Sequence, residues 1–369
     1  MQRQLRYIGF TLIANLLIIN ALYAAPSITA ISGTISNGQN IMITGLNFGS
    51  TGPNIVMYDD FELGINGVAV SGAVRDAQVG TWRYIQDYGY GYYGTYSNLQ
   101  PHSGSMSFRQ NWGSSARQAN GMGWASPTIS NPSTSFYISF WMFLPSAQDV
   151  PGTNNPDGPN WKEWWLSAND VFASDFGFQT ITNSLPGEMD FGWIDGSMDR
   201  ASAGYRSCPF TKGRWARFDV YIVGSTTSSG AIKSWFTDPS KARYLWSSAN
   251  GKTLDSANAT GWKYLHFPGY GRYDTNSNTY YDDIYVATGP GAQARVEIGN
   301  QPTYAACTNL AVATVSSWSS TSITATVRSG SFSSGSAYLY VIDSDGVANT
   351  NGYPITLGQA VTPTTDTTP

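Results

Sequence analysis

The sequence predicts an all-β protein, and three observations carry that prediction. Apolar and polar residues alternate with a period of two in many short runs, which is the pattern of half-buried strands. Aromatic residues make up 14% of the chain and charged residues only 12%, while 39 glycines supply turns. A helical period is nowhere sustained, and a disordered chain would lack the aromatic residues.

The first strands are expected close to the N-terminus. Residues 28–31 and 39–44 alternate, Asn37-Gly38 marks a turn between them, and residues 54–58 form a third strand. Residues 43–49, with the sequence ITGLNFG, resemble the opening of an IPT/TIG domain, which is a small immunoglobulin-like sandwich. Such a sandwich needs more strands than these three.

The missing strands are expected at the far end, at 318–327, 336–342 and 353–357. We therefore predict one small sandwich whose first part is 26–58 and whose second part is 301–358. An insertion of about 240 residues, 59–300, divides it, as loop tips of compact domains tolerate. The alternative is two separate, incomplete modules, each of which would expose its inner face.

The insertion resembles the concanavalin A-like jelly roll of laminin-G-type domains and of several polysaccharide lyase families. The resemblance rests on acidic first and last strands (59–62 and 280–287), on Gly213-Arg214-Trp215, and on the run WKEWW at 161–165. It implies a large antiparallel jelly-roll sandwich between the two parts of the small one. None of these segments is an enzyme signature, so the resemblance predicts a fold more than an activity.

The N-terminal segment indicates export, and the C-terminal segment indicates a linker. Arg3 and Arg6 precede an apolar run from Ile8 to Leu22, and small residues follow at 24–25. We interpret 1–25 as a cleaved signal peptide, the alternative being an uncleaved anchor. Residues 359–369 are rich in Thr and Pro and are expected to be a linker. We therefore expect a secreted or cell-surface protein with no membrane span after cleavage.

The net charge of −4 gives no basic field for nucleic acid or acidic lipid, so the partner is expected to be neutral or recognised locally. The aromatic, weakly charged composition and the jelly-roll resemblance together suggest a polysaccharide or cell-surface glycan as that partner. Cys208 and Cys307 are the only cysteines, and in an exported chain they predict a disulfide. Zinc-type spacings are absent.

Five acids suggest a calcium site. In a jelly roll the first and last strands are often neighbours, so their carboxylates can converge as hard oxygen ligands. The alternative is that they cap strand ends or accept hydrogen bonds from backbone amides. The candidate ligands are Asp59, Asp60, Glu62, Asp282 and Asp283.

Aromatic residues beside Gly- and Asn-rich stretches suggest a sugar-binding surface, because flat rings stack on sugar faces. The alternative is that the rings fill the sandwich core. The candidate residues are Trp161, Trp164, Trp193, Tyr90 and Tyr92, the last two in an expected exposed loop at 88–96.

A third group of residues suggests catalysis. Jelly-roll lyases carry a catalytic Tyr in a Lys-x-Gly-x-Tyr context, and Gly271-Arg272-Tyr273 resembles its second half, with Gly269 in place of the Lys. Lyase chemistry needs a cation for the uronate carboxylate, a base and an acid. The candidates are His266, Tyr270, Arg272, Tyr273 and Lys162, each with a packing role as the alternative.

Three functions remain open on the sequence. The first is a secreted carbohydrate-binding protein, the second a polysaccharide lyase acting on a uronate polymer by β-elimination, and the third a structural or adhesive surface protein. A retaining glycosidase is not supported, because no Glu-x-Asp-x-x-Glu run is present, and neither is a Gly-x-Ser-x-Gly hydrolase.

Overall fold

The computed structural model describes residues 24–70, 74–84, 94–111, 120–121, 125–150, 161–168, 176–180, 188–193, 205–207, 209–254, 256–267, 270–272 and 277–361. In these ranges every strand pair is antiparallel, and helix is limited to short 3₁₀ turns at Ser256–Asn258 and Tyr304–Ala306. The all-β prediction is therefore confirmed.

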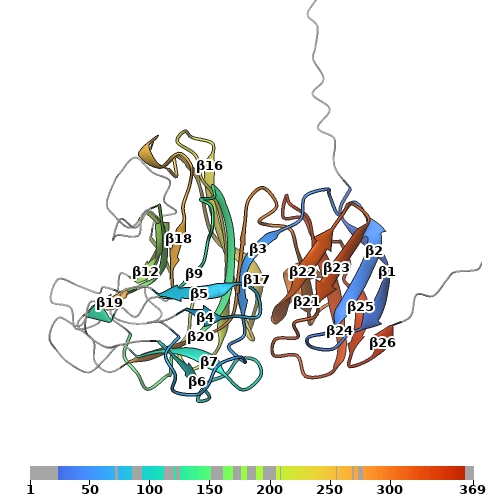
Figure 1. Ribbon diagram of the computed structural model, residues 1–369, viewed down its shortest axis with the longest axis horizontal. Coiled ribbons are helices and arrows are strands. Elements are labelled where there is room, and N and C mark those ends of the chain that lie inside the picture. The colour runs from blue at the N-terminus through green and yellow to red at the C-terminus, as the bar shows by residue number, and fades with distance from the viewer. Residues whose placement is uncertain are drawn as a thin grey trace, which may run out of the picture.

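A small sandwich unites the two ends of the chain, at the right of Figure 1. Its core contains Ile31, Ile41 and Ile43 from the N-terminal strands together with Val296 and Leu339 from the C-terminal ones. In sheet order its strands are β25 (Tyr353–Leu357), β24 (Gly335–Ile342), β21 (Arg295–Gly299), β22 (Leu310–Trp318), β23 (Ser322–Thr326), β2 (Asn40–Leu46), β1 (Ser27–Thr34) and β26 (Ala360–Val361).

Strand alternation explains how these segments fold. In β2, Ile41 and Ile43 are buried while Met42 and Thr44 are exposed, so one face meets the core and the other meets water. The register pairs Ile43 with Ile323 on one side and with Ile31 on the other. Segments about 280 residues apart in sequence thus close one core, as the long-range pairing of a sandwich requires.

The large sandwich occupies the left of Figure 1 and is built from two facing sheets. The first, which we call the inner sheet, runs β17 (Lys241–Gly251), β16 (Gly230–Asp238), β15 (Ala216–Val223), β10 (Ser135–Phe143), β20 (Asn278–Thr288), β7 (Ser107–Asn111) and β6 (Thr95–Ser97). In addition, β3 (Asn54–Asp59) pairs with β20.

The second sheet, which we call the outer sheet, runs β14 (Tyr205–Ser207), β13 (Glu188–Trp193), β12 (Phe176–Thr180), β11 (Trp161–Ser167), β19 (Tyr270–Arg272) and β8 (Asn120–Gly121). Strand β18 (Tyr264–His266) also pairs with β11. A third, small sheet contains β4 (Arg75–Asp76), β5 (Thr81–Tyr84) and β9 (Ala125–Pro127). A core rich in Trp and Phe lies between the inner and outer sheets.

Two strands lie in a different sandwich from the one that the sequence predicted. Residues 54–58 were expected in the small sandwich, but β3 pairs with β20 of the large one, with Tyr58 opposite Tyr285. Strand β21, expected inside the insertion, instead pairs with β22 and β24 of the small sandwich. The chain therefore crosses between domains at 47–53 and 289–294. These crossings touch, since a Cβ on Gly291 would clash with the Gly52 carbonyl oxygen.

The small sandwich covers the face of the inner sheet that points away from the large core. All eleven residues of β20 are buried, because Ile284 and Val286 face the core while Tyr285 and Ala287 face the small sandwich. The apolar contact between the domains is modest and centres on Tyr58, Tyr137, Tyr285 and Val312.

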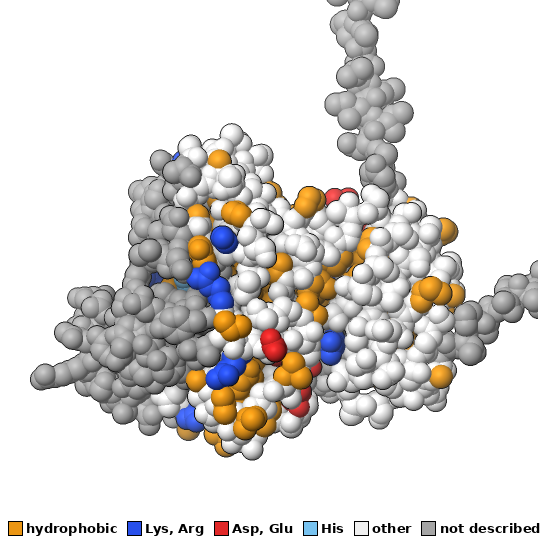
Figure 2. Space-filling view, viewed as in Figure 1, with side chains coloured by type: hydrophobic (Ala, Val, Ile, Leu, Met, Phe, Trp, Pro, Cys, Tyr) orange, Lys and Arg blue, Asp and Glu red, His pale blue; other side chains and the backbone are white. Residues whose placement is uncertain are grey.

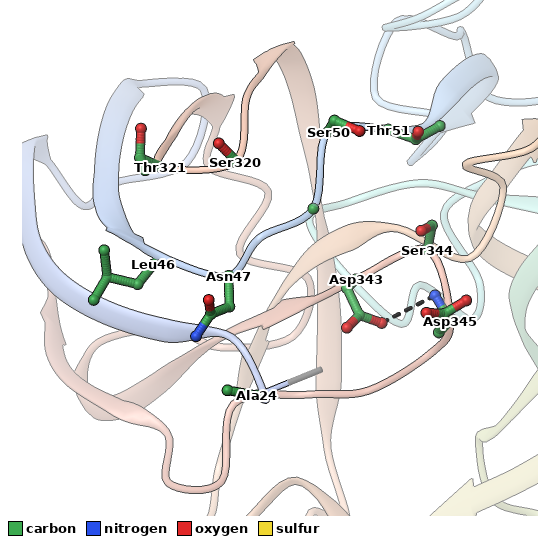
Figure 3. A pocket seen from close by; sticks show the side chains of 11 residues that line it. Ala24, Leu46, Asn47, Ser50, Thr51, Ser320, Thr321, Asp343, Ser344 and Asp345 are labelled. Carbon is green, nitrogen blue, oxygen red and sulfur yellow. Dashed lines mark hydrogen bonds between the residues drawn. The ribbon is translucent and has the colours of Figure 1, made fainter. Parts of the chain in front are cut away.

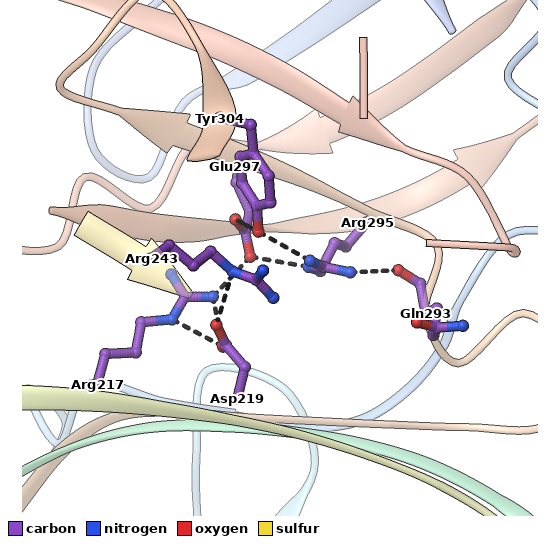
Figure 4. Close-up of polar contacts among 7 residues, drawn as sticks. All are labelled: Arg217, Asp219, Arg243, Gln293, Arg295, Glu297 and Tyr304. Atoms are coloured by element: carbon purple, nitrogen blue, oxygen red, sulfur yellow. Dashed lines mark hydrogen bonds and ion pairs between the residues drawn. The ribbon is translucent and has the colours of Figure 1, made fainter. Parts of the chain in front are cut away.

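A buried ionic network completes this contact, and Figure 4 shows it. Arg217 donates from Nε to Asp219 at 2.8 Å and from Nη2 to Glu297 of β21 at 2.6 Å. Arg295 Nε donates to the same Glu297 oxygen at 2.8 Å. We call the set the interdomain arginine cluster; it contains Arg217, Asp219, Arg243, Arg295, Glu297 and Tyr304.

The cluster sets the charge state of Glu297. Burial alone would raise the pKa of Glu297, but the charges of Arg217 and Arg295 and the Tyr304 hydrogen bond of 2.6 Å more than offset it. The pKa of Glu297 is lowered to about 2. The carboxylate is thus ionised throughout the ordinary pH range, and removing it leaves buried guanidinium groups uncompensated.

We expect Glu297→Gln to lower the free energy of unfolding by about 3 kcal/mol at pH 7, because one partner of a buried ion pair is lost. Since the folded pKa lies below the unfolded one, the wild type loses this contribution as pH falls from about 4.5 towards about 2, and the variant loses no such contribution. Urea unfolding at several pH values measures both effects. The exposed Asp76→Asn change in β4 is the control, and equal loss in both variants would contradict the role of the cluster.

Candidate functional site

A β-bulge in β11 organises the outer sheet. Lys162 pairs with Gln179 and Trp164 with Phe178, so Glu163 is the additional residue. Trp161, Trp164 and Leu166 are fully buried in the large core. The side chains that alternate with these three along β11 therefore point away from the large core. We call that side of the sheet the outer face; it carries Lys162, Trp165 and Ser167 from β11.

Strand β18 adds two more side chains to the outer face. Trp165 pairs with His266 and Ser167 with Tyr264, while Leu265 between them lies in the core. Ser167 Oγ and His266 Nε2 share a hydrogen bond of 2.9 Å. The Trp165 and His266 ring centroids are 5.1 Å apart. Arg83 of β5 lies over the Tyr264 ring, with its Cζ 4.5 Å from the centroid, which is a cation–π contact.

His266 is held neutral. Its side chain is buried, and burial, followed by the charge of Arg83, lowers its pKa to about 3. A neutral imidazole has one ring nitrogen that donates a hydrogen bond and one that accepts a hydrogen bond. Trp165 and Ser167 are buried as well, whereas Lys162, Tyr264 and Arg83 are half-buried. Among these side chains, the half-buried ones are therefore the ones that solvent reaches.

The structure brings several predicted catalytic residues to one edge of β11. Strands β18 and β19 lie end to end along that edge, and Lys162 pairs with Tyr270 in register. Arg272 pairs with Asn120 of β8 on the far side of β19. Tyr273 lies outside the described residues. Catalysis by these residues stays a prediction.

The aromatic prediction needs a correction at two positions. Trp161 and Trp164 are fully buried in the core, so their rings do not present a surface to a sugar. The run WKEWW does not show which tryptophans point inwards, because the bulge at Glu163 shifts the alternation. Trp193 lies in β13 opposite Phe176, and Tyr90 and Tyr92 lie outside the described residues. Sequence reasoning missed Arg83 and Ser167, which reach the outer face only through tertiary contact.

The five acids accept hydrogen bonds, mostly from backbone amides. Asp282 Oδ2 accepts from the amides of His102 and Ser103, and Asp283 contacts His102 Nδ1 at 2.7 Å. Glu62 accepts from Ser105 and Met106 amides. Asp59 accepts from the Phe61 amide and Trp82 Nε1, and Asp60 from the Glu62 amide.

This arrangement does not support the calcium site. Burial raises the pKa of Asp59 to about 7, and burial followed by the charge of Asp283 raises that of Asp60 to about 6. Among the described residues, no group of three or more His, Cys, Asp or Glu side chains is placed to hold a metal ion. The alternative interpretation, strand capping, accounts for the contacts. Calcium binding stays a prediction without geometric support.

The predicted disulfide is not formed. Cys307 is a buried free thiol, and its Sγ lies 3.6 Å from the Thr303 carbonyl oxygen and 3.9 Å from that of Gln301. Burial raises its pKa, so the thiol is protonated. Cys208 lies outside the described residues.

Two open cavities lie away from the outer face. Figure 3 shows a cavity of about 500 Å³ at one end of the small sandwich, lined by short polar side chains and by Asp343 and Asp345. The Asp343 carboxylate is engaged by the Asp345 and Val347 amides. A second cavity, of about 370 Å³, lies between the sandwiches, where Asp60 and His102 face the loop Ser329–Ser333. Neither cavity contains a Trp or Tyr ring.

Comparison with known proteins gives limited information. No family model matches the chain, and no curated protein matches it. Similar solved structures include an endo-β-1,4-glucuronan lyase from Trichoderma reesei (13% identity, 59% of this chain and 95% of that one, TM-score 0.34). Others are the alginate lyase Aly36B (14%, 52% and 86%, 0.32) and a GH131 β-glucanase catalytic domain from Podospora anserina (13%, 53% and 79%, 0.30). At TM-scores this low, the likeness carries no argument about activity. Among the described residues, no helix is long and apolar enough to cross a membrane.

We expect the His266 ring to stay neutral between pH 8 and pH 5, because burial and Arg83 lower its pKa to about 3. Two-dimensional NMR of the two imidazoles measures this, and His266→Gln assigns the signal. As the folded pKa lies below the unfolded value, the wild type should lose stability as pH falls from about 6.5 towards 3, and the variant should lose less. A His266 signal titrating near pH 6.5 would contradict the buried arrangement.

Proposed function

We propose that this chain is a secreted or cell-surface protein that binds an extracellular polysaccharide through the outer face of its large sandwich. The observation that carries the proposal is the β11 bulge, which places Lys162 and Trp165 on the same face as Tyr264 and His266. The small sandwich already covers the inner sheet. The outer sheet lies on the side of the large sandwich that faces away from the small one (Figure 1), so the small sandwich does not cover the outer face.

The chemistry of this face favours an acidic polysaccharide. Lys162 and Arg83 are cations, and Arg83 holds the Tyr264 ring beside it. A tyrosine ring offers a stacking surface for a sugar, and a guanidinium or ammonium group pairs with a uronate carboxylate. Figure 2 shows Lys and Arg side chains gathered on the large sandwich, whereas the visible face of the small sandwich is mostly uncharged. On the outer face itself, the positive charge comes from Lys162 and Arg83, although the chain as a whole is acidic.

The contact residues and the supporting residues have different tasks. Lys162, Tyr264 and Arg83 are half-buried and meet the polymer. Buried Trp165, Ser167 and His266 fix the position of Tyr264 and its strand through the ring contact and the 2.9 Å hydrogen bond. A binding site requires such a division, because rigid buried groups hold the contact residues in place.

We expect Tyr264→Ala to weaken binding to alginate or glucuronan roughly 2- to 10-fold, because a ring contact contributes about 0.5–1.5 kcal/mol. Lys162→Ala should weaken binding more at low salt than at high salt, since the contribution of the Lys162 ammonium group is electrostatic. Affinity electrophoresis and calorimetry measure both. Half-buried Tyr353→Ala and Lys233→Ala, which lie off the outer face, are matched controls. If the wild-type protein binds no acidic or neutral glycan, the structural or adhesive function takes precedence.

A second candidate function is β-elimination of a uronate polymer. The observation that favours it is the register of β11, which pairs Lys162 with Tyr270 of β19 and Trp165 with neutral His266 of β18 along one edge. Lys162 or Arg83 would neutralise the carboxylate, and a base would remove the C5 proton. An acid would protonate the leaving glycosidic oxygen as the C4–C5 double bond forms.

Incubation with alginate, glucuronan and heparin-type polymers tests the lyase function, because the unsaturated product absorbs at about 235 nm. We expect Tyr270→Phe and Lys162→Ala to reduce the rate about 100-fold or more, as loss of a proton-transfer or charge-stabilising group does. Lys233→Ala should leave it unchanged. A flat absorbance trace with a protein that still binds the polymer would leave binding as the function.

A further inference from the structure

The interdomain arginine cluster carries one positive charge more than its own carboxylates balance. Three guanidinium groups, of Arg217, Arg243 and Arg295, face only two carboxylates, of Asp219 and Glu297. The three arginine side chains are 1%, 9% and 3% exposed. Tyr304 does not supply the missing charge, because burial raises its pKa to about 12 and its hydroxyl donates to Glu297.

Other charged groups at the domain contact are engaged elsewhere. The Arg328 Cζ lies 5.1 Å from the centroid of the Tyr58 ring. Burial and the charge of Asp283 raise the pKa of Asp60, whereas the charge of Arg328 lowers it. The carboxylates paired with the three cluster arginines are those of Asp219 and Glu297. Within the described part of the chain, the excess charge is therefore a property of the cluster itself. Buried charges in proteins are normally paired, since an isolated one is costly.

A donor without a partner lies in the same place. Arg217 uses Nε and Nη2 for Asp219 and Glu297, but its Nη1 is buried with no hydrogen-bond partner. Thr237 of β16 is directly opposite Arg217 in register, and its Oγ1 is also buried without a partner. Paired residues of neighbouring strands share one face of the sheet, so the two groups lie side by side.

Unpartnered hydroxyls extend across this face of the inner sheet. Ser139, paired with both Asp219 and Tyr285, has a buried Oγ without a partner, and so do the hydroxyls of Tyr137 and Tyr285. Native structures leave few buried polar groups unsatisfied, and a bound water or ion is one of the ways in which such groups are satisfied. Here the unpartnered hydroxyls lie on the same face of the inner sheet as the arginine cluster with its unbalanced positive charge.

We propose that the domain contact binds a small monovalent anion, such as chloride, between Arg217 Nη1 and the Thr237 hydroxyl. One negative charge balances the cluster, and a guanidinium N–H and a hydroxyl are both donors, which suits an anion. A polyatomic dianion would reverse the imbalance and require more space. The anion would stabilise the docking of the two sandwiches, so the stability of the whole chain depends on halide concentration.

Thermal unfolding in sodium bromide against sodium gluconate, at constant ionic strength, tests this in the full mature chain. We expect bromide to raise Tm by roughly 1–3 °C for each tenfold increase above its dissociation constant. Arg243→Met removes the excess charge at the rim of the cluster and should abolish the bromide dependence. Thr237→Val should weaken it, and it provides a second variant if Arg243→Met does not fold.

The matched control is Lys241→Met, an exposed residue of the same strand as Arg243, which should leave the bromide dependence as in the wild type. Anomalous diffraction from bromide-grown crystals locates the ion directly, with a peak expected beside Arg217 Nη1. The same Tm in bromide and gluconate, or only water density at that position, would overturn the proposal. These results do not depend on polysaccharide binding, so the two proposals fail separately.

Discussion

The buried contact between Arg217 of the inner sheet and Glu297 of the small sandwich is the interaction on which the arrangement of the molecule depends. Each sandwich has its own apolar core, and the apolar contact shared between them is small. Ion pairs with Arg295 and Asp219 therefore fix how the two bodies dock, because their geometry tolerates little displacement. Docking buries one face of the large sandwich and leaves the outer face as the side on which we propose that the polysaccharide binds.

Strand-level structure could be predicted from the sequence because it depends on local alternation. The segments that became β2 and β24 were recognised in this way, and the N-terminal strands do pair with β23, near the other end of the chain. The sheet to which a strand belongs is not a local property. The apolar run in β3 suits a buried strand of either sandwich, and only its register with β20 assigns it to the large one.

The candidate site was predicted in part, for a related reason. Residue type and position along the chain identified Lys162 and His266, which do lie on one sheet. The sugar-binding assignment was wrong for Trp161 and Trp164, since the extra residue Glu163 turns both rings into the core. Arg83 is distant in sequence from Tyr264 and carries no motif, so only tertiary structure reveals their contact.

The use of charge at the domain contact has a physical rationale. Replacing a buried ion network by apolar side chains is often neutral or stabilising, so the network is not explained by stability alone. An apolar contact, however, would allow several docking angles, whereas Glu297 can accept from Arg217, Arg295 and Tyr304 in one geometry only. A domain divided by a long insertion must bring its two parts back to one position. Crossing segments that touch at Gly52 and Gly291 and a directional ionic contact meet that requirement together.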